Sequence, residues 1–104
     1  MKTLPLPADE LTLLKAVFLR HPEISEVRIF GSRAKGVYTS SSDIDLAVWG
    51  TVDPLRAQAI AAELDELPLP YRYDVQAFDA IKSQPLREHI ERVGISIYRK
   101  SAGN

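Results

Sequence analysis

The sequence contains no cysteine among its 104 residues, and this absence excludes several kinds of chemistry. Without cysteine there is no disulfide, no thiolate nucleophile and no zinc site built on sulfur. Long apolar stretches are also missing, since no run approaches the roughly 20 residues that a membrane-spanning helix needs. Met1 to Pro7 lack the basic start and apolar centre of a signal peptide. We therefore expect a cytoplasmic protein with no membrane interaction.

Charge of one sign is not in excess either. Thirteen lysine and arginine residues face fourteen aspartate and glutamate residues, for a net charge of −1. The basic residues are scattered apart from the short Arg33–Lys35 cluster. Because proteins that bind nucleic acid directly usually carry a positive field, we expect no direct nucleic-acid binding.

The remaining composition, 45% hydrophobic and 26% charged, is typical of a soluble globular protein. The length predicts one domain over residues 1–104, with 101–104 as a loose tail and no internal linker. A chain of this size can bury one core, but it leaves no room for a separate domain that selects a substrate.

Strands that alternate with helices predict an α/β sheet domain. Apolar residues at helical spacing indicate a helix over Ala8 to Arg20, and Asp53–Pro54 opens a second helix that ends before Pro68. A last helix is expected over Pro85 to Val93, with Gly94 as its left-handed cap. Runs of β-branched and aromatic residues predict four strands, at Val27–Phe30, Asp43–Trp49, Tyr71–Phe78 and Ile95–Tyr98.

Three aspartates in two of these strands are unusual, because aspartate is depleted in strands. Asp43 and Asp45 alternate along one strand, so they point to one face about 7 Å apart. Their mutual repulsion is relieved by a divalent cation such as magnesium, which prefers oxygen ligands. Asp74 on a neighbouring strand would complete a site for two metals roughly 4 Å apart. The alternative for an isolated Asp-x-Asp pair is a solvent-facing strand.

A glycine–serine turn lies directly after the first strand. Gly31 allows a phosphate to approach the backbone, and Ser32 can add a hydrogen bond. Arg33 and Lys35 supply positive charge nearby. Although a lone Gly-Ser pair is more often a simple turn, its combination with the aspartates favours a site for a nucleotide triphosphate.

Gly31–Ser32, ten intervening residues and Asp43–Ile44–Asp45 together resemble the signature of the DNA polymerase β-like nucleotidyltransferase superfamily. The stretch GSRAKGVYTSSSDIDLAV is similar especially to the minimal nucleotidyltransferases, or MNT proteins, of bacteria and archaea. The likeness spans residues 27–78. It implies a single-domain polymerase β-like fold, either α/β or α+β, with a mixed sheet of about four strands flanked by helices.

The resemblance also implies roles for individual residues. Asp43 and Asp45 would bind two magnesium ions that hold ATP, and Gly31 and Ser32 would hold its β- and γ-phosphates. Asp74 matches the third acid, which binds the catalytic metal and helps to deprotonate the attacking hydroxyl. The nearby Asp79 is interpreted as a helix cap.

Three functions remain open at this point. MNT proteins are often encoded beside a HEPN-domain toxin, and the resemblance implies an antitoxin that transfers AMP from ATP to a hydroxyl of that toxin. The second possibility is an antitoxin that neutralises its partner by binding alone. The third is a nucleotidyltransferase for small molecules. We rank them in that order, because an intact set of three acids favours catalysis.

A few other residues are interpreted as structural. His21 and His89 lie far from the motif and are expected to be surface or packing residues. The serines of 40–42 are expected to form a polar loop. Three aromatic residues could stack on a base but are expected to pack in the core or against a partner; they are Trp49, Tyr71 and Tyr73.

Overall fold

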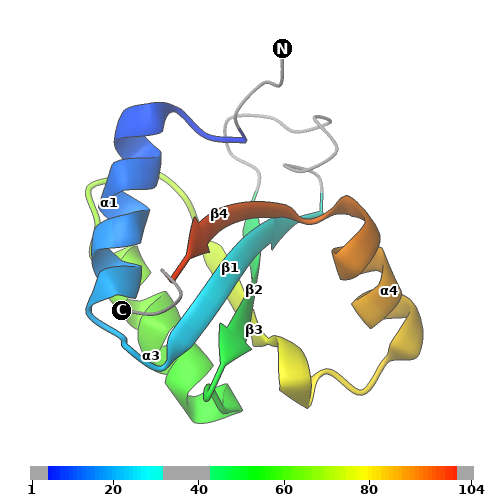
Figure 1. Ribbon diagram of the computed structural model, residues 1–104. Coiled ribbons are helices and arrows are strands. Elements are labelled where there is room, and N and C mark those ends of the chain that lie inside the picture. The colour runs from blue at the N-terminus through cyan, green and yellow to red at the C-terminus, as the bar shows by residue number, and fades with distance from the viewer. Residues whose placement is uncertain (1–4, 32–42, 101–104) are drawn as a thin grey trace.

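A computed structural model describes residues 5–31 and 43–100, in which helices cover both faces of a mixed four-stranded sheet (Figure 1). The elements in chain order are α1 (Ala8–Leu19), β1 (Ile24–Phe30), β2 (Ile44–Gly50), α3 (Pro54–Asp65), β3 (Tyr73–Ala77), the 3₁₀ turn η1 (Phe78–Ala80), α4 (Gln84–Val93) and β4 (Ile95–Arg99). The predicted fold is therefore confirmed. The predictions for Ser32, Arg33, Lys35, the serine loop and the 101–104 tail lie outside the described residues.

The strands are ordered β3-β2-β1-β4. β1 is antiparallel to both β2 and β4, whereas β2 and β3 are parallel. A parallel pair needs a crossover connection, and α3 provides it. This topology brings the end of β1 and the starts of β2 and β3 to the same edge of the sheet.

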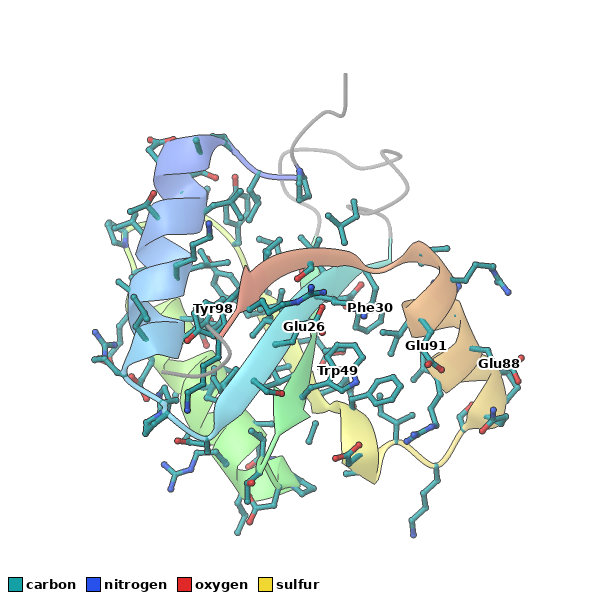
Figure 2. The ribbon with its side chains drawn as sticks, viewed as in Figure 1. Glu26, Phe30, Trp49, Glu88, Glu91 and Tyr98 are labelled. Atoms are coloured by element: carbon teal, nitrogen blue, oxygen red, sulfur yellow. The ribbon has the colours of Figure 1, made fainter. Side chains whose placement is uncertain are left out.

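The core has two layers because side chains alternate between the faces of each strand. On β2, the predicted apolar face of Ile44, Leu46 and Val48 is confirmed, and it packs with α1 and α3. On the other face, Ala47 joins a smaller cluster under α4. Phe30 and Trp49 lie between the sheet and α4 in Figure 2. No helix in residues 5–31 and 43–100 is long and apolar enough to cross a membrane.

The helix ends differ partly from the predictions. Asp53 caps α3 as expected, since its carboxylate accepts a hydrogen bond of 2.8 Å from the amide of Arg56. The prediction of Asp79 as a cap is wrong, because it lies within η1 while Ser83 caps α4. The left-handed conformation predicted for Gly94 is also wrong, as its φ is −63°. Glycine fits there because a Cβ would collide with the carbonyl oxygen of Ile90.

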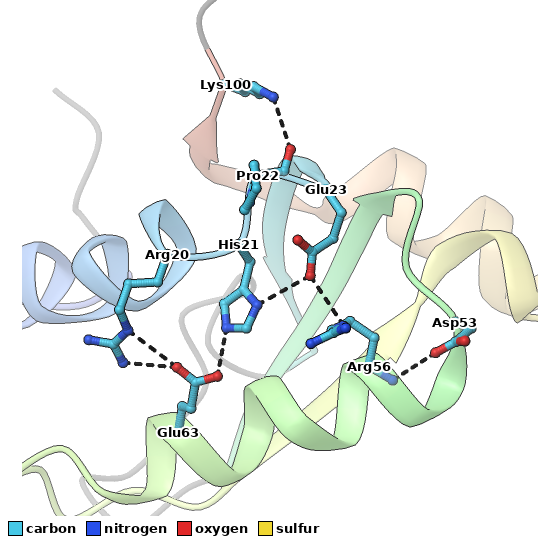
Figure 3. Close-up of polar contacts among 8 residues, drawn as sticks. All are labelled: Arg20, His21, Pro22, Glu23, Asp53, Arg56, Glu63 and Lys100. Carbon is cyan, nitrogen blue, oxygen red and sulfur yellow. Dashed lines mark hydrogen bonds and ion pairs between the residues drawn. The ribbon is translucent and has the colours of Figure 1, made fainter.

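His21 is buried where α1, β1 and α3 meet, and both of its ring nitrogens face carboxylates (Figure 3). Nε2 lies 2.6 Å from Oε2 of Glu63, and Nδ1 lies 3.2 Å from Oε2 of Glu23. Arg20 binds Glu63 and Arg56 binds Glu23, so the two carboxylates are each shared with an arginine. Each ring nitrogen of His21 therefore lies within hydrogen-bond distance of a carboxylate oxygen. The expectation that His21 is a packing residue is confirmed, and its ring also contacts two glutamates.

We expect His21→Ala to lower the free energy of unfolding by about 2 kcal/mol, or the melting temperature by about 8–16 °C. Glu63 has a lowered pKa, chiefly through its hydrogen bond with Arg20 and then through His21. The pKa of Glu23 is lowered chiefly by a backbone hydrogen bond and then by His21. This stability is present above the ordinary glutamate pKa of 4.5 and is lost as the pH falls through the lowered values.

Thermal melts of wild type and His21→Ala between neutral pH and pH ~3 test this expectation, because the two curves should converge in acid. His89→Ala, which changes a half-buried histidine of α4, serves as the matched control and should change the melting temperature little. A constant difference between wild type and His21→Ala at every pH would contradict the role given to the carboxylates.

Candidate active site

Asp45 and Asp74 lie side by side at the edge where β1, β2 and β3 meet. The register pairs Asp45 with Asp74 across the parallel strands, and Asp45 with Phe30 across the antiparallel ones. Asp45 is half-buried, whereas Asp74 is exposed. The sequence had predicted that the second strand begins at Asp43, but Asp43 is exposed and lies just before β2, which begins at Ile44. The fold thus brings together two acids that are 29 positions apart in the sequence.

Asp45 has a raised pKa because it is partly buried and because Asp74 and then Asp43 place negative charge beside it. Each of these causes disfavours the ionised carboxylate. A bound cation would reverse the effect, since it favours the ionised form of every acid around it. The donor set therefore fits a hard divalent cation such as magnesium, which takes carboxylate oxygens.

The gathering of all three acids on one ion stays a prediction. Within the part of the chain that the structure describes, no three acidic or imidazole groups are close enough to define a metal site by geometry alone. The three aspartates nevertheless interact electrostatically, because the charges of Asp74 and Asp43 both raise the pKa of Asp45.

Gly31 directly follows β1 and lies next to the carboxylate of Asp45. Its φ is +75°, a left-handed conformation that glycine adopts without strain. A Cβ at this position would collide with Oδ2 of Asp45 and lie 3.3 Å from its Cγ. The sequence had suggested that glycine is needed for the approach of a phosphate. The structure adds a second reason, which is that the backbone of Gly31 lies directly against the carboxylate of Asp45.

Gln76 was not identified from the sequence, although it contacts the site. Its side-chain nitrogen donates to both carboxylate oxygens of Asp74, at 3.3 Å each. The signal that could have revealed it is its position two residues after Asp74, since alternate residues of a strand share a face.

Trp49 is half-buried and packs against the smaller hydrophobic cluster, which agrees with the packing role expected for it. It stacks on Phe78 with ring centroids 4.3 Å apart, and the guanidinium of Arg28 lies 4.8 Å from its ring centroid. Arg87 covers Phe78 and donates to the carbonyl oxygens of Phe78 and Ile81. This stack connects the sheet with η1 and α4, on the face that also carries Asp45.

Comparison with known proteins agrees with the placement of these aspartates beside Gly31. The chain belongs to the polymerase beta nucleotidyltransferase family, whose profile matches residues 13–102. Within this class it is similar to the probable protein adenylyltransferase MntA of Haemophilus influenzae. The two are 31% identical over 99 residues, which cover 93% of this chain and 86% of that relative.

Solved structures show the same fold. A minimal nucleotidyltransferase, 27% identical, superposes with a TM-score of 0.64 over 84% of this chain and 88% of its own. A toxin–antitoxin determined with AMP-PNP has a TM-score of 0.72 at 22% identity, covering 89% of this chain and 75% of that one. A complex of tri-AMPylated HEPN toxin from Shewanella oneidensis with MNT antitoxin has a TM-score of 0.65 at 20% identity, covering 88% and 71%.

Proposed function

We propose that this chain is an antitoxin that transfers AMP from ATP to a hydroxyl group of a HEPN-type toxin. The pairing of Asp45 with Asp74 across β2 and β3 is the observation that carries the proposal. Similarity to MntA, a probable protein adenylyltransferase, supports the choice of a protein as acceptor. The fold shared with the MNT antitoxin bound to a tri-AMPylated toxin supports the choice of a HEPN-type partner.

The proposed reaction is a single in-line displacement. The acceptor hydroxyl attacks the α-phosphorus of ATP, so that a new oxygen–phosphorus bond forms. The bond between the α-phosphorus and the bridging oxygen to the β-phosphorus breaks, and pyrophosphate leaves. The hydroxyl proton passes to the carboxylate of Asp74, which is exposed and therefore reachable by the acceptor.

The other site residues position the nucleotide. Gly31 lets the triphosphate approach the backbone at the end of β1, as part of the nucleotide site proposed for Gly31, Ser32, Arg33 and Lys35. Asp43, Asp45 and Asp74 would hold two magnesium ions. When bound, magnesium supplies the positive charge that balances the triphosphate and the charge developing on the leaving pyrophosphate.

Labelled ATP tests which bond breaks. With magnesium and the partner toxin present, label from the α-phosphate of ATP should appear on the toxin, and label from the γ-phosphate should not. Asp74→Asn should reduce α-label transfer by about 100-fold or more, because it removes both a metal ligand and a base.

The same experiment separates the alternatives. Transfer of γ-label would show a kinase reaction and would contradict the proposal. Absence of any label on a toxin that is nonetheless inhibited by the protein would favour neutralisation by binding alone. Label on a small molecule in place of the toxin would favour the third possibility.

A further inference from the structure

Gln76 lies on β3 and points to the same face of the sheet as Asp74. Its Nε2 donates to Oδ1 and to Oδ2 of Asp74, at 3.3 Å in both cases. An ionised carboxylate can only accept hydrogen bonds, so the nitrogen of the amide must be the atom that faces it. A donor shared between the two oxygens constrains the rotation of the carboxylate group about its Cβ–Cγ bond.

The sheet leaves space for this contact. Gln76 pairs with Ala47 on β2, two residues along from the pairing of Asp74 with Asp45. Ala47 is fully buried and has only a methyl side chain, so the longer glutamine can lie over it. Gln76 is half-buried and belongs to β3, so the backbone of the sheet fixes the point from which its side chain extends.

We propose that Gln76 is a positioning residue, which holds the Asp74 carboxylate in the orientation needed to bind a metal ion and to accept the proton of the acceptor. The inference rests on the proposed function, because it concerns the same site. Gln76 itself touches neither substrate nor metal in this account.

A neutral donor is suited to this task. Glu26, which lies away from the proposed site, is paired instead with two arginines: Arg28 lies at 2.9 Å and Arg99 at 3.3 Å. Such pairing neutralises the carboxylate and would compete with a bound cation. The amide of Gln76 orients Asp74 and leaves its negative charge available for the metal.

Binding of Mn²⁺, followed by electron paramagnetic resonance in the presence of AMP-PNP, tests the inference without catalysis. Gln76→Ala should weaken Mn²⁺ affinity by about 10- to 100-fold, the usual effect of removing a partner of a metal ligand. The melting temperature should change little, since Gln76 is not part of either hydrophobic cluster. In the transfer reaction kcat should fall while KM for ATP stays the same.

Gln84→Ala is the matched control. Gln84 also donates to a carboxylate, at 3.1 Å from Oε2 of Glu88, but on α4, so its removal should leave Mn²⁺ affinity unchanged. If Gln76→Ala binds Mn²⁺ with wild-type affinity while Asp74→Asn binds it more weakly, the inference about Gln76 is overturned and the proposed metal site is not. Unchanged affinity in both variants would also overturn the proposed metal site. Equal losses in Gln76→Ala and Gln84→Ala would overturn the inference as well, because the effect would not be specific to Asp74.

Discussion

Asp45→Asn should reduce AMP transfer by about 100- to 1000-fold and, at the same time, stabilise the metal-free protein. The loss of transfer follows from removal of a metal-binding carboxylate next to Asp74. The gain in stability follows from the raised pKa of Asp45, which burial causes first, then Asp74 and Asp43. A raised carboxyl pKa means that stability falls as the pH rises from the ordinary value of 3.8 through the raised one. Asparagine carries no charge and avoids that loss.

At neutral pH without metal, the gain should be about 0.5–1 kcal/mol, or about 2–8 °C in melting temperature. Mg²⁺ with AMP-PNP should raise the melting temperature of wild type more than that of Asp45→Asn. Asp79→Asn is the matched control, since Asp79 is an exposed acid near Asp74 in sequence and should be dispensable for transfer. An Asp45→Asn protein that transfers AMP at the wild-type rate, or that melts below wild type, would contradict this account.

Gly31→Ala should have the second largest effect, with transfer reduced by about 100-fold and stability reduced by about 1–2 kcal/mol. The stability cost arises because alanine must adopt the left-handed φ of +75°. The catalytic cost arises because the new methyl group collides with Oδ2 of Asp45 and displaces that carboxylate. Melting curves and transfer rates per folded protein measure the two effects separately.

Gly50→Ala provides the control for backbone strain. Gly50 also has a positive φ, of +130°, and its Cβ would collide with the backbone oxygen of Glu23 at the other end of β2. It should lower stability while the folded protein keeps its transfer rate. If Gly31→Ala instead loses stability but keeps transfer, the contact between Gly31 and Asp45 has no catalytic importance.

The elements that can be predicted from the sequence are those whose signals are local. Alternation of Ile44, Leu46 and Val48 identified the buried face of β2, and Asp53–Pro54 marked the start of α3. The glycine–serine turn and the acid spacing led to the correct family. These signals depend on neighbours in the chain, so no knowledge of the tertiary structure was needed.

The parts that could not be predicted depend on contacts between distant segments. The glycine at position 94 is required by its approach to Ile90 and Arg28, and nothing in its neighbours distinguishes this from a left-handed cap. The pairing of Asp45 with Asp74 requires the order and register of the sheet. Likewise, the contact of His21 with Glu63 joins residues 42 positions apart, so the sequence could indicate a packing histidine but not this carboxylate partner.

Intact mass spectrometry of the partner toxin tests the central claim most directly. After incubation with this protein, ATP and magnesium, the toxin mass should increase by one or more whole AMP groups, and toxin activity should fall in parallel. The same incubation with Asp45→Asn should leave both the mass and the activity unchanged. A toxin that is neutralised to the same extent by wild type and Asp45→Asn, with no increase in mass, would contradict the account.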